Sequence, residues 1–180
     1  MVALLTKKEL ALLKKLSTPI RIQNFLDSLP FNFEKQGETH MSPRRVLRTR
    51  RAHCIEGALL AALALSVHGE EPLLMDLTSK KHDDDHIVAL YKRNGYWGAI
   101  SKTNHATIRF RDPVYRTLRE LVLSYFHEWF LNSTGEKLLE CYSKSLDLRT
   151  VKHVKHSVLD SSTYWITSEK DLWNIADALS

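Results

Sequence analysis

The chain has 180 residues, a length that fits one domain with a sizeable hydrophobic core and argues against two domains. Its hydrophobic content of 43%, charged content of 26% and net charge of +5 fit a soluble globular protein and fall well short of a nucleic-acid-binding composition. Two cysteines are too few for a disulfide framework, and neither a secretory signal pattern nor an apolar run of bilayer length is present, so we expect a cytoplasmic protein with no membrane partner.

The first 40 residues are predicted to be mainly helical. Leucines recur on one face of residues 4–16 while most lysines lie elsewhere, which is the pattern of an amphipathic helix. Ser17-Thr18-Pro19 then provides a helix start, and Pro30 ends this second helix. The polar residues 31–42 are expected to form a loop.

Five arginines lie within residues 44–51. One interpretation is a solvated, partly turn-forming segment that precedes a helix, and the other is a rim that attracts anions. We favour the first, because no aromatic residues alternate with the arginines as they do in proteins that stack on single strands.

A long helix is predicted over residues 54–67. It is rich in Ala and Leu on nearly every side, and a helix that is apolar all round is normally buried. His68-Gly69 ends the helix, since glycine suits the left-handed position after a helix. Cys54 is its first residue.

The clearest local signal is a β-hairpin over residues 86–101. Two β-prone runs flank Asn94-Gly95, the pair that favours a two-residue type I′ turn. A short strand over residues 72–77 and an exposed loop over residues 80–85 precede the hairpin. With this turn, Arg93 pairs with Tyr96.

The same register predicts the neighbours of His86, the first residue of the hairpin. His86 lies opposite Thr103, Ser101 is diagonal to it on the same face, and Asn104 is one step beyond.

The last third of the chain carries weaker signals. Residues 112–130 are predicted to be a helix that starts at Asp-Pro, and residues 157–166 are predicted to be extended. Further elements are expected around residues 133–146 and 168–179, the latter with a helix-start pattern at Ser168. The second cysteine, Cys141, has no special setting and is expected to be a structural thiol.

Cys54 is placed for nucleophilic chemistry. Free backbone N–H groups and the positive end of the helix dipole lower the pKa of a thiol at a helix N-terminus. The same N–H groups can hold an oxyanion after attack on a carbonyl. A thiol used in this way needs a nearby histidine to take up and return a proton. His86 is the best candidate, because it follows a loop and begins a strand, and a group from residues 101–104 should orient its ring.

The order of these features resembles the transglutaminase-like family of the papain-like cysteine-enzyme superfamily. The family's helix reads roughly Cys-x-x-x-Ala-x-Leu-x-x-Ala-Leu followed by a Gly turn, and its His-started strand is followed by a Trp. This chain matches with Cys54, Ala58, Leu60, Leu63, Gly69, His86 and Trp97. The resemblance implies an α+β, papain-like fold in which helices pack on a small antiparallel sheet.

Residues 1–180 are then one domain. Its core spans about residues 40–105, between a helical N-terminal part, 1–40, and a helical and extended C-terminal part, 106–180.

One departure from the family concerns the third catalytic position. The family places an Asp four residues after the Trp, and here that residue is Ser101. Serine cannot supply a negative charge, so Asn104 is the alternative partner of His86. Glu56 would oppose a thiolate and is expected to turn outward. Trp97 and His53 are the candidate substrate-binding residues. Trp97 is expected to form core or pocket wall, and His53, adjacent to Cys54, is expected to point elsewhere unless it contacts substrate.

The resemblance implies cysteine-dependent acyl transfer or amide hydrolysis on a peptide or protein substrate, with no cofactor. A catalytically lapsed papain-like binding module is one alternative, and a nucleic-acid-binding protein that uses residues 44–51 is a weaker one. Metal binding is not expected, because the spacing of four histidines fits no standard ligand set: His82, His105, His153 and His156.

Overall fold

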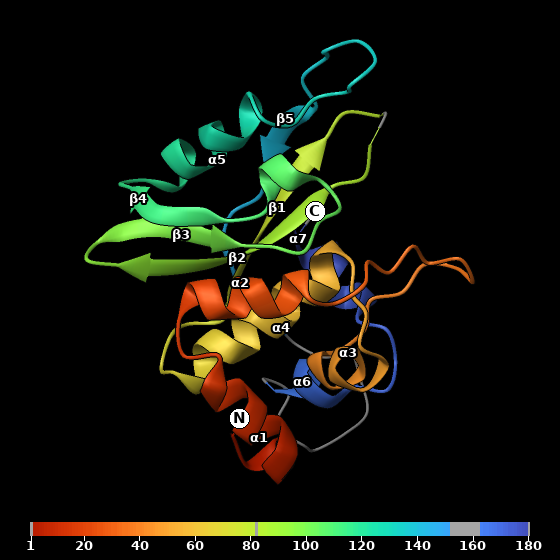
Figure 1. The fold of residues 1–180 in the computed structure, drawn as a ribbon, viewed down its shortest axis with the longest axis vertical. Coiled ribbons are helices and arrows are strands. Elements are labelled where there is room, and N and C mark those ends of the chain that lie inside the picture. Colours follow the sequence, from red (N-terminus) through yellow and green to blue (C-terminus); the bar gives the residue numbers. More distant parts are fainter. Residues whose placement is uncertain (1, 82, 152–162, 180) are drawn as a thin grey trace.

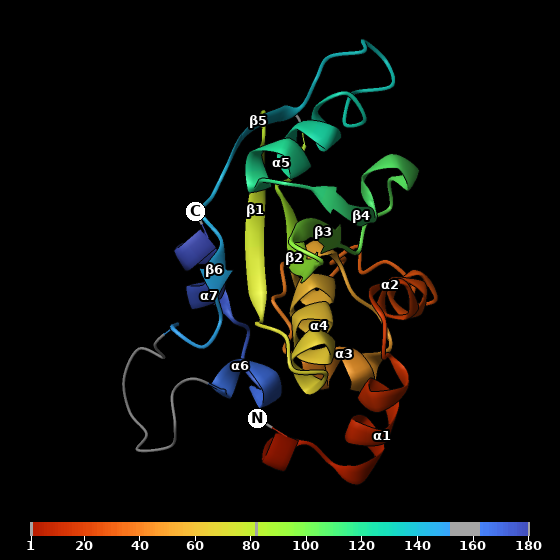
Figure 2. The same ribbon diagram turned by 90° about the vertical axis from the view of Figure 1, so that its left-hand side faces the viewer.

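A computed structural model describes residues 2–81, 83–151 and 163–179. Helices and a single curved antiparallel sheet form two parts of the molecule, with most helices on one side of the sheet (Figures 1 and 2). The α+β class expected from the sequence is therefore confirmed. No helix in these ranges has both the length and the apolar character needed to cross a membrane.

The N-terminal helices begin at conventional caps. After a short 3₁₀ turn, η1 (Val2–Leu4), come α1 (Lys7–Lys15) and α2 (Pro19–Asp27). Thr6 and Thr18 accept hydrogen bonds from backbone N–H groups of the first turns, which satisfies donors that a helix leaves free. The two predicted helices are thus confirmed, with shorter bounds.

The arginine-rich segment forms a helix, and the prediction of a partly turn-forming segment there was wrong. Helix α3 (Pro43–Thr49) begins at a Ser42 cap with Pro43 in its first turn, and it ends at Arg50, whose φ is 59°. Ion pairs to distant acids hold three arginines: Arg44 to Glu9, Arg45 to Asp171 and Arg48 to Glu169. These contacts tie α3 to the rest of the fold, a role that sequence spacing does not reveal.

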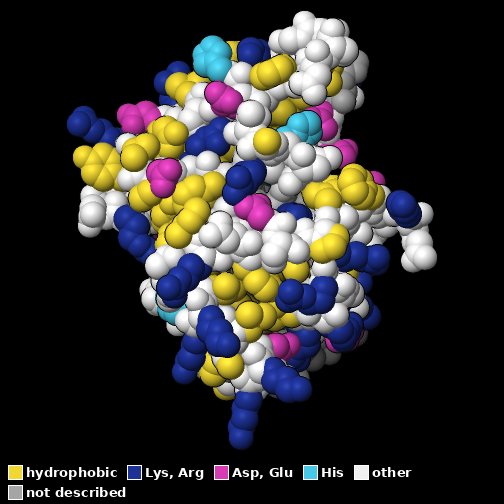
Figure 3. Space-filling model, in the orientation of Figure 1, with side chains coloured by type: hydrophobic (Ala, Val, Ile, Leu, Met, Phe, Trp, Pro, Cys, Tyr) yellow, Lys and Arg dark blue, Asp and Glu magenta, His cyan; other side chains and the backbone are white. Residues whose placement is uncertain are grey.

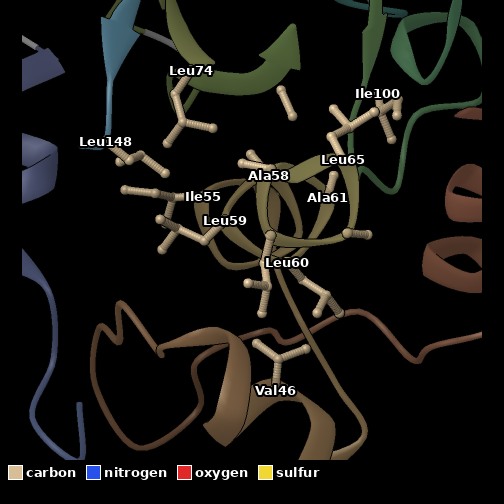
Figure 4. Packing of buried hydrophobic residues seen from close by; sticks show 14 of the residues in the cluster. Val46, Ile55, Ala58, Leu59, Leu60, Ala61, Leu65, Leu74, Ile100 and Leu148 are labelled. Carbon is tan, nitrogen blue, oxygen red and sulfur yellow. The ribbon is translucent and has the colours of Figure 1, made fainter. Parts of the chain in front are cut away.

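Helix α4 (Cys54–Val67) has the predicted bounds and lies at the centre of the molecule. Every residue from Ile55 to Leu65 is buried, because α2 and α3 cover one side of the helix and strands of the sheet cover the other (Figure 4). Gly57 lets the first turn approach the segment after the hairpin, since a Cβ there would lie 2.3 Å from the Cβ of Lys102. The start of α4 is therefore held against residues 101–105.

The sheet has the order β4-β3-β2-β1-β5, and β6 also pairs with β1. Its strands are β1 (Leu73–Ser79), β2 (His86–Arg93), β3 (Tyr96–Ile100), β4 (Arg111–Tyr115), β5 (Leu139–Tyr142) and β6 (Leu146–Asp147). One face of β2 packs on α4 through residues such as Ala89 and Tyr91. The other face packs through Val88 and Leu90 on a second cluster that contains α5 (Leu118–Phe126).

The hairpin has the predicted turn and register. Arg93 pairs with Tyr96, and Asn94 and Gly95 have the positive φ angles that a type I′ turn requires. The predicted pair of His86 with Thr103 does not form, because β3 ends at Ile100. The Gln23 side chain on α2 instead takes the place of a strand partner, accepting from Ser101 N at 3.1 Å and donating to Ser101 O at 2.9 Å.

The region predicted as a helix over 112–130 is a strand followed by a helix. Strand β4 lies at the edge of the sheet, where Pro113 is tolerated because its missing N–H costs no ladder bond. Thr117 then caps α5. The predicted extended segment 157–166 lies outside the described residues up to 162, and its end belongs to α6 (Tyr164–Thr167).

Helix α7 (Trp173–Leu179) confirms the helix predicted near residues 168–179. The region around 133–146 contains β5 and β6, which extend the sheet beyond β1. Cys141 lies on β5, where it is exposed to solvent rather than packed in the core.

Candidate functional site

The N-terminus of α4 meets the start of β2 at a cavity of about 500 Å³. Cys54 lies in this cavity, partly exposed, with its Sγ 3.6 Å from the backbone oxygen of Asp85. One wall comes from the loop over residues 31–40, and the opposite wall comes from residues 83–87 and 102–105. The thiol is thus accessible to a ligand in a recess of the surface.

His53 contacts the thiol, so the expectation that it points elsewhere was wrong. Its Nδ1 lies 3.7 Å from Cys54 Sγ, while its Nε2 lies 2.6 Å from the carbonyl oxygen of Thr39. A carbonyl only accepts hydrogen bonds, so Nε2 carries a proton. Glu34 Oε1 lies 3.3 Å from the same nitrogen. His53 is therefore held between the thiol and an acidic wall.

Glu56 is fully buried, so the prediction that it turns outward was also wrong. Its carboxylate accepts hydrogen bonds from the backbone N–H groups of His53 and Met41, at 3.0 and 3.1 Å, and from the Thr39 hydroxyl at 2.8 Å. Asn32 donates to it at 3.2 Å. These bonds fasten the 31–41 segment to the first turn of α4 and so fix the position of His53.

His86 is 4% exposed and reaches the thiol from the opposite wall. Its Nε2 lies 3.1 Å from Ser101 Oγ and 3.2 Å from the carbonyl oxygen of Ile108. The Ser101 hydroxyl donates to the Arg109 carbonyl, which leaves its lone pairs free to accept from His86. The Nε2 proton is assigned from these partners, and Nδ1 is then the basic nitrogen of the neutral ring.

The structure brings together three of the four predicted catalytic residues. Ser101, which is fully buried, contacts His86 directly. Asn104 lies exposed at the cavity wall, and within the described ranges no hydrogen bond joins it to His86. Trp97 does not line the cavity. It is half-buried in β3, where Lys92 Nζ lies 4.8 Å from its ring centre.

The two imidazoles control the charge of the thiol. Burial alone would raise the pKa of Cys54, but hydrogen bonds from His53 and His86, together with their positive charge, lower it to about 6. Burial opposes protonation of His53, yet its hydrogen bond to Cys54 and the negative charges of Cys54 and Glu56 raise its pKa to about 9. Near neutral pH the pair is therefore a thiolate beside an imidazolium.

Three residues of the cavity were not found from the sequence. Asp76 on β1 and His40 both line it, and the His40 ring centre lies 5.9 Å from that of His53. Trp129 packs on His86 with ring centres 6.0 Å apart. Asp76 lies in a short apolar strand, and nothing in that pattern marks it as a site residue. His40 and Trp129 reach the site only through tertiary packing.

Among the described residues, no group of three or more His, Cys, Asp and Glu is arranged to hold a metal ion. His105 Nε2 lies 4.0 Å from Asp83 Oδ2. His82, His153 and His156 lie outside the described residues.

No protein-family model matches the chain, and no curated protein matches it either. The chemistry of the site therefore has to be inferred from its own geometry.

Proposed function

We propose that this protein is a cysteine-dependent acyl-transfer enzyme or amide hydrolase with a papain-like fold, acting on a peptide or protein. One observation carries the proposal: the Cys54 thiol lies at the N-terminus of a buried helix, in an open cavity, with the imidazoles of His53 and His86 close enough to lower its pKa. A structural cysteine needs neither accessibility nor a depressed pKa, whereas a nucleophile needs both.

The reaction begins with attack of the Cys54 thiolate on a substrate carbonyl carbon. A C–S bond forms, and the carbonyl π electrons move to oxygen, where free N–H groups of the first turn of α4 stabilise the negative charge. The cycle begins with His86 protonated at Nδ1, and when the tetrahedral intermediate collapses, the C–N bond breaks and this proton passes to the departing amine. A thioester to Cys54 remains.

The second half of the reaction regenerates the thiolate and the protonated His86. His86 Nδ1 takes a proton from water or from an amine as that nucleophile attacks the thioester carbonyl. The C–S bond then breaks, releasing an acid from water or a new amide from an amine. Ser101 and the Ile108 carbonyl orient the His86 ring throughout, at 3.1 and 3.2 Å from Nε2. His53 stabilises the thiolate from the other side.

The test uses a Cys141→Ser background, in which Cys54 is the only thiol. Iodoacetamide should alkylate Cys54 with a half-maximal rate near pH 6. p-Nitrophenyl acetate should give a burst of one p-nitrophenolate per chain, which Cys54→Ser abolishes. An alkylation profile like that of free cysteine, together with no burst, would overturn the proposal.

One observation favours the second candidate, a binding module whose chemistry has lapsed. The described hydrogen bonds of His86 Nε2 go to a hydroxyl and a backbone carbonyl, and neither can supply the negative charge that a catalytic carboxylate gives to an imidazolium. The same two measurements separate the candidates. Alkylation with a half-maximal rate near pH 6 and no acyl burst would favour the module.

A further inference from the structure

The cavity around Cys54 is acidic, although the chain as a whole carries a net charge of +5. In the view of Figure 3, Lys and Arg side chains spread over the lower, helical half of the molecule. Six acidic residues line the cavity: Glu34, Glu38, Asp76, Asp83, Asp84 and Asp85. Among the described residues that line the cavity, Lys102 is the one lysine or arginine, and its Nζ donates at 2.6 Å to the carbonyl oxygen of Leu29.

Two of these acids are fixed parts of the wall. Asp83 accepts from Trp129 Nε1 at 2.9 Å, and Asp85 accepts from the backbone N–H of Ser79 at 2.7 Å. These bonds hold the loop between β1 and β2 over the thiol. Its negative charge therefore stays at the cavity and does not move away into solvent.

Asp76 indicates a ligand independently of the acidic lining of the cavity. It is 5% exposed, and its Oδ2 accepts from the Thr78 hydroxyl at 2.8 Å. Its Oδ1 is buried without a hydrogen-bond partner in the described part of the chain. Buried polar atoms are almost always paired, because an unpaired one keeps its full desolvation cost. Because Asp76 lines the cavity, we infer that a bound ligand supplies the hydrogen-bond donor that its carboxylate lacks.

Asp76 also lies beside the reacting groups. Its strand partner is Ile87, the residue after His86. Burial raises the pKa of Asp76 to about 6; the negative charges of Asp85 and Cys54 add to this effect, while the Thr78 hydrogen bond and the charge of His86 oppose it. A bound cation would relieve this repulsion and favour the ionised carboxylate.

An apolar surface at the same cavity suits the stem of a long basic side chain. Phe33 is 65% exposed at the cavity wall, and its ring centre lies 5.0 Å from that of Phe31. Lysine and arginine pack their methylene groups on such surfaces while their charged ends reach polar groups.

We propose that the cavity selects a peptide with a lysine or arginine side chain next to the reacting carbonyl, and that Asp76 binds the charged end of that side chain. The inference rests on the proposed function, because it assigns the substrate class of the same site. Glu34, Glu38 and the Asp83–Asp85 loop attract the cation, and the Asp76 carboxylate receives its hydrogen bond.

The test compares three irreversible thiol reagents in the Cys141→Ser background: acetyl-lysine, acetyl-norleucine and acetyl-glutamate chloromethyl ketones. Norleucine keeps the length of lysine without its charge. The second-order rate constant at Cys54 should be about tenfold higher for lysine than for norleucine, the effect of one charge-assisted hydrogen bond. The glutamate reagent should be the slowest. Equal constants for lysine and norleucine would overturn the inference.

Asp76→Asn should reduce the lysine-to-norleucine ratio to less than about threefold, since it keeps the shape of the side chain and removes its charge. Glu140→Gln is the matched control, because Glu140 is exposed on β5 and does not line the cavity. It removes one negative charge elsewhere and should keep the full ratio. A ratio that Asp76→Asn leaves unchanged would remove Asp76 from the proposal.

A second variant keeps the inference testable if Asp76→Asn fails to fold. Glu38 and Asp84 are both exposed, and replacing them with Gln and Asn should lower the ratio by about twofold and weaken its dependence on salt. An unchanged ratio in this variant would contradict an acidic selection surface.

The two proposals fail in different ways. If all three reagents react with the rate and pH profile of free cysteine, the proposed function fails. If Cys54 is activated but shows no preference for the lysine reagent, only the substrate class fails.

Discussion

His53 and His86 both contact the Cys54 thiol, yet the chain surrounds the two imidazoles with different chemistry. The wall that holds His53 contains the carboxylates of Glu34 and Glu56, at 3.3 and 3.5 Å from its Nε2. The wall that holds His86 offers the Ser101 hydroxyl, the Ile108 carbonyl and aromatic rings. Carboxylates stabilise an imidazolium, whereas neutral acceptors only fix the orientation of the ring.

This difference assigns the two rings different tasks in the proposed mechanism. With its pKa raised to about 9, His53 stays protonated near neutral pH and is too weak an acid to exchange protons readily. It holds the thiolate. The described hydrogen bonds of His86 Nε2 go to neutral acceptors, which makes its Nδ1 the nitrogen that transfers protons in the proposed mechanism. Variants of these residues test the division of roles between His53 and His86.

His86→Ala should slow the steady release of p-nitrophenolate that follows the burst by roughly 10²- to 10⁴-fold, because hydrolysis of the thioester needs a base that takes a proton from water. The burst itself should survive, since His53 still holds the thiolate and p-nitrophenolate leaves without needing a proton. The measurement is the turnover rate at pH about 8, where the thiolate form dominates in both proteins. If His53→Asn causes the larger loss of turnover at this pH, the roles of the two histidines are reversed.

Glu56→Ala should lower the free energy of unfolding by about 3 kcal/mol, because it leaves several buried donors without an acceptor. Urea denaturation measures this loss. Glu120→Ala is the comparison, since Glu120 caps the exposed start of α5, where about 0.5 kcal/mol is expected. Equal losses would show that the Glu56 bonds do not hold the His53 wall in place.

His53→Asn should raise the pKa of the Cys54 thiol from about 6 toward its ordinary value. The sign follows from the loss of a cation that favours the thiolate. Iodoacetamide alkylation should then fall about tenfold at pH about 6.5 and change little at pH about 9.5, where the thiolate dominates in both proteins. An alkylation rate that falls equally at both pH values would indicate a blocked cavity and not an altered charge.

Most features of the wall that holds His86 could be predicted from the sequence alone. Helix α4 and the hairpin follow from local signals, the Ala/Leu run with its Gly69 end and the Asn94-Gly95 turn, and both formed as predicted. The contact of Ser101 with His86 follows from hairpin register. Asn104 has no described contact with His86, and the sequence gives no sign that the Gln23 side chain on α2 pairs with the Ser101 backbone just after the strand ends at Ile100.

The His53 wall was beyond prediction for a related reason. Each contact that turns His53 toward the thiol comes from the 31–41 segment, which reads as a polar loop, or from Glu56, whose burial depends on that segment. The same limit explains β4. An Asp-Pro pair fits a helix start, and only its pairing with β3 at the edge of the sheet makes it a strand.

Ser101→Ala should reduce the turnover rate after the burst by about tenfold, the smallest effect on catalysis expected for these variants. The change removes one acceptor from His86 Nε2 and leaves the Ile108 carbonyl, so the ring loses part of its orientation and keeps its proton assignment. Asn104→Ala provides the contrast and should have a smaller effect than Ser101→Ala, because the exposed Asn104 makes no described contact with His86. If Asn104→Ala costs more, the 101–105 segment moves on substrate binding, and the amide of Asn104 becomes the group that orients the ring. The burst amplitude should stay at one per chain in both variants, since neither change touches the thiol, and a lower amplitude would indicate unfolded protein instead of a misaligned imidazole.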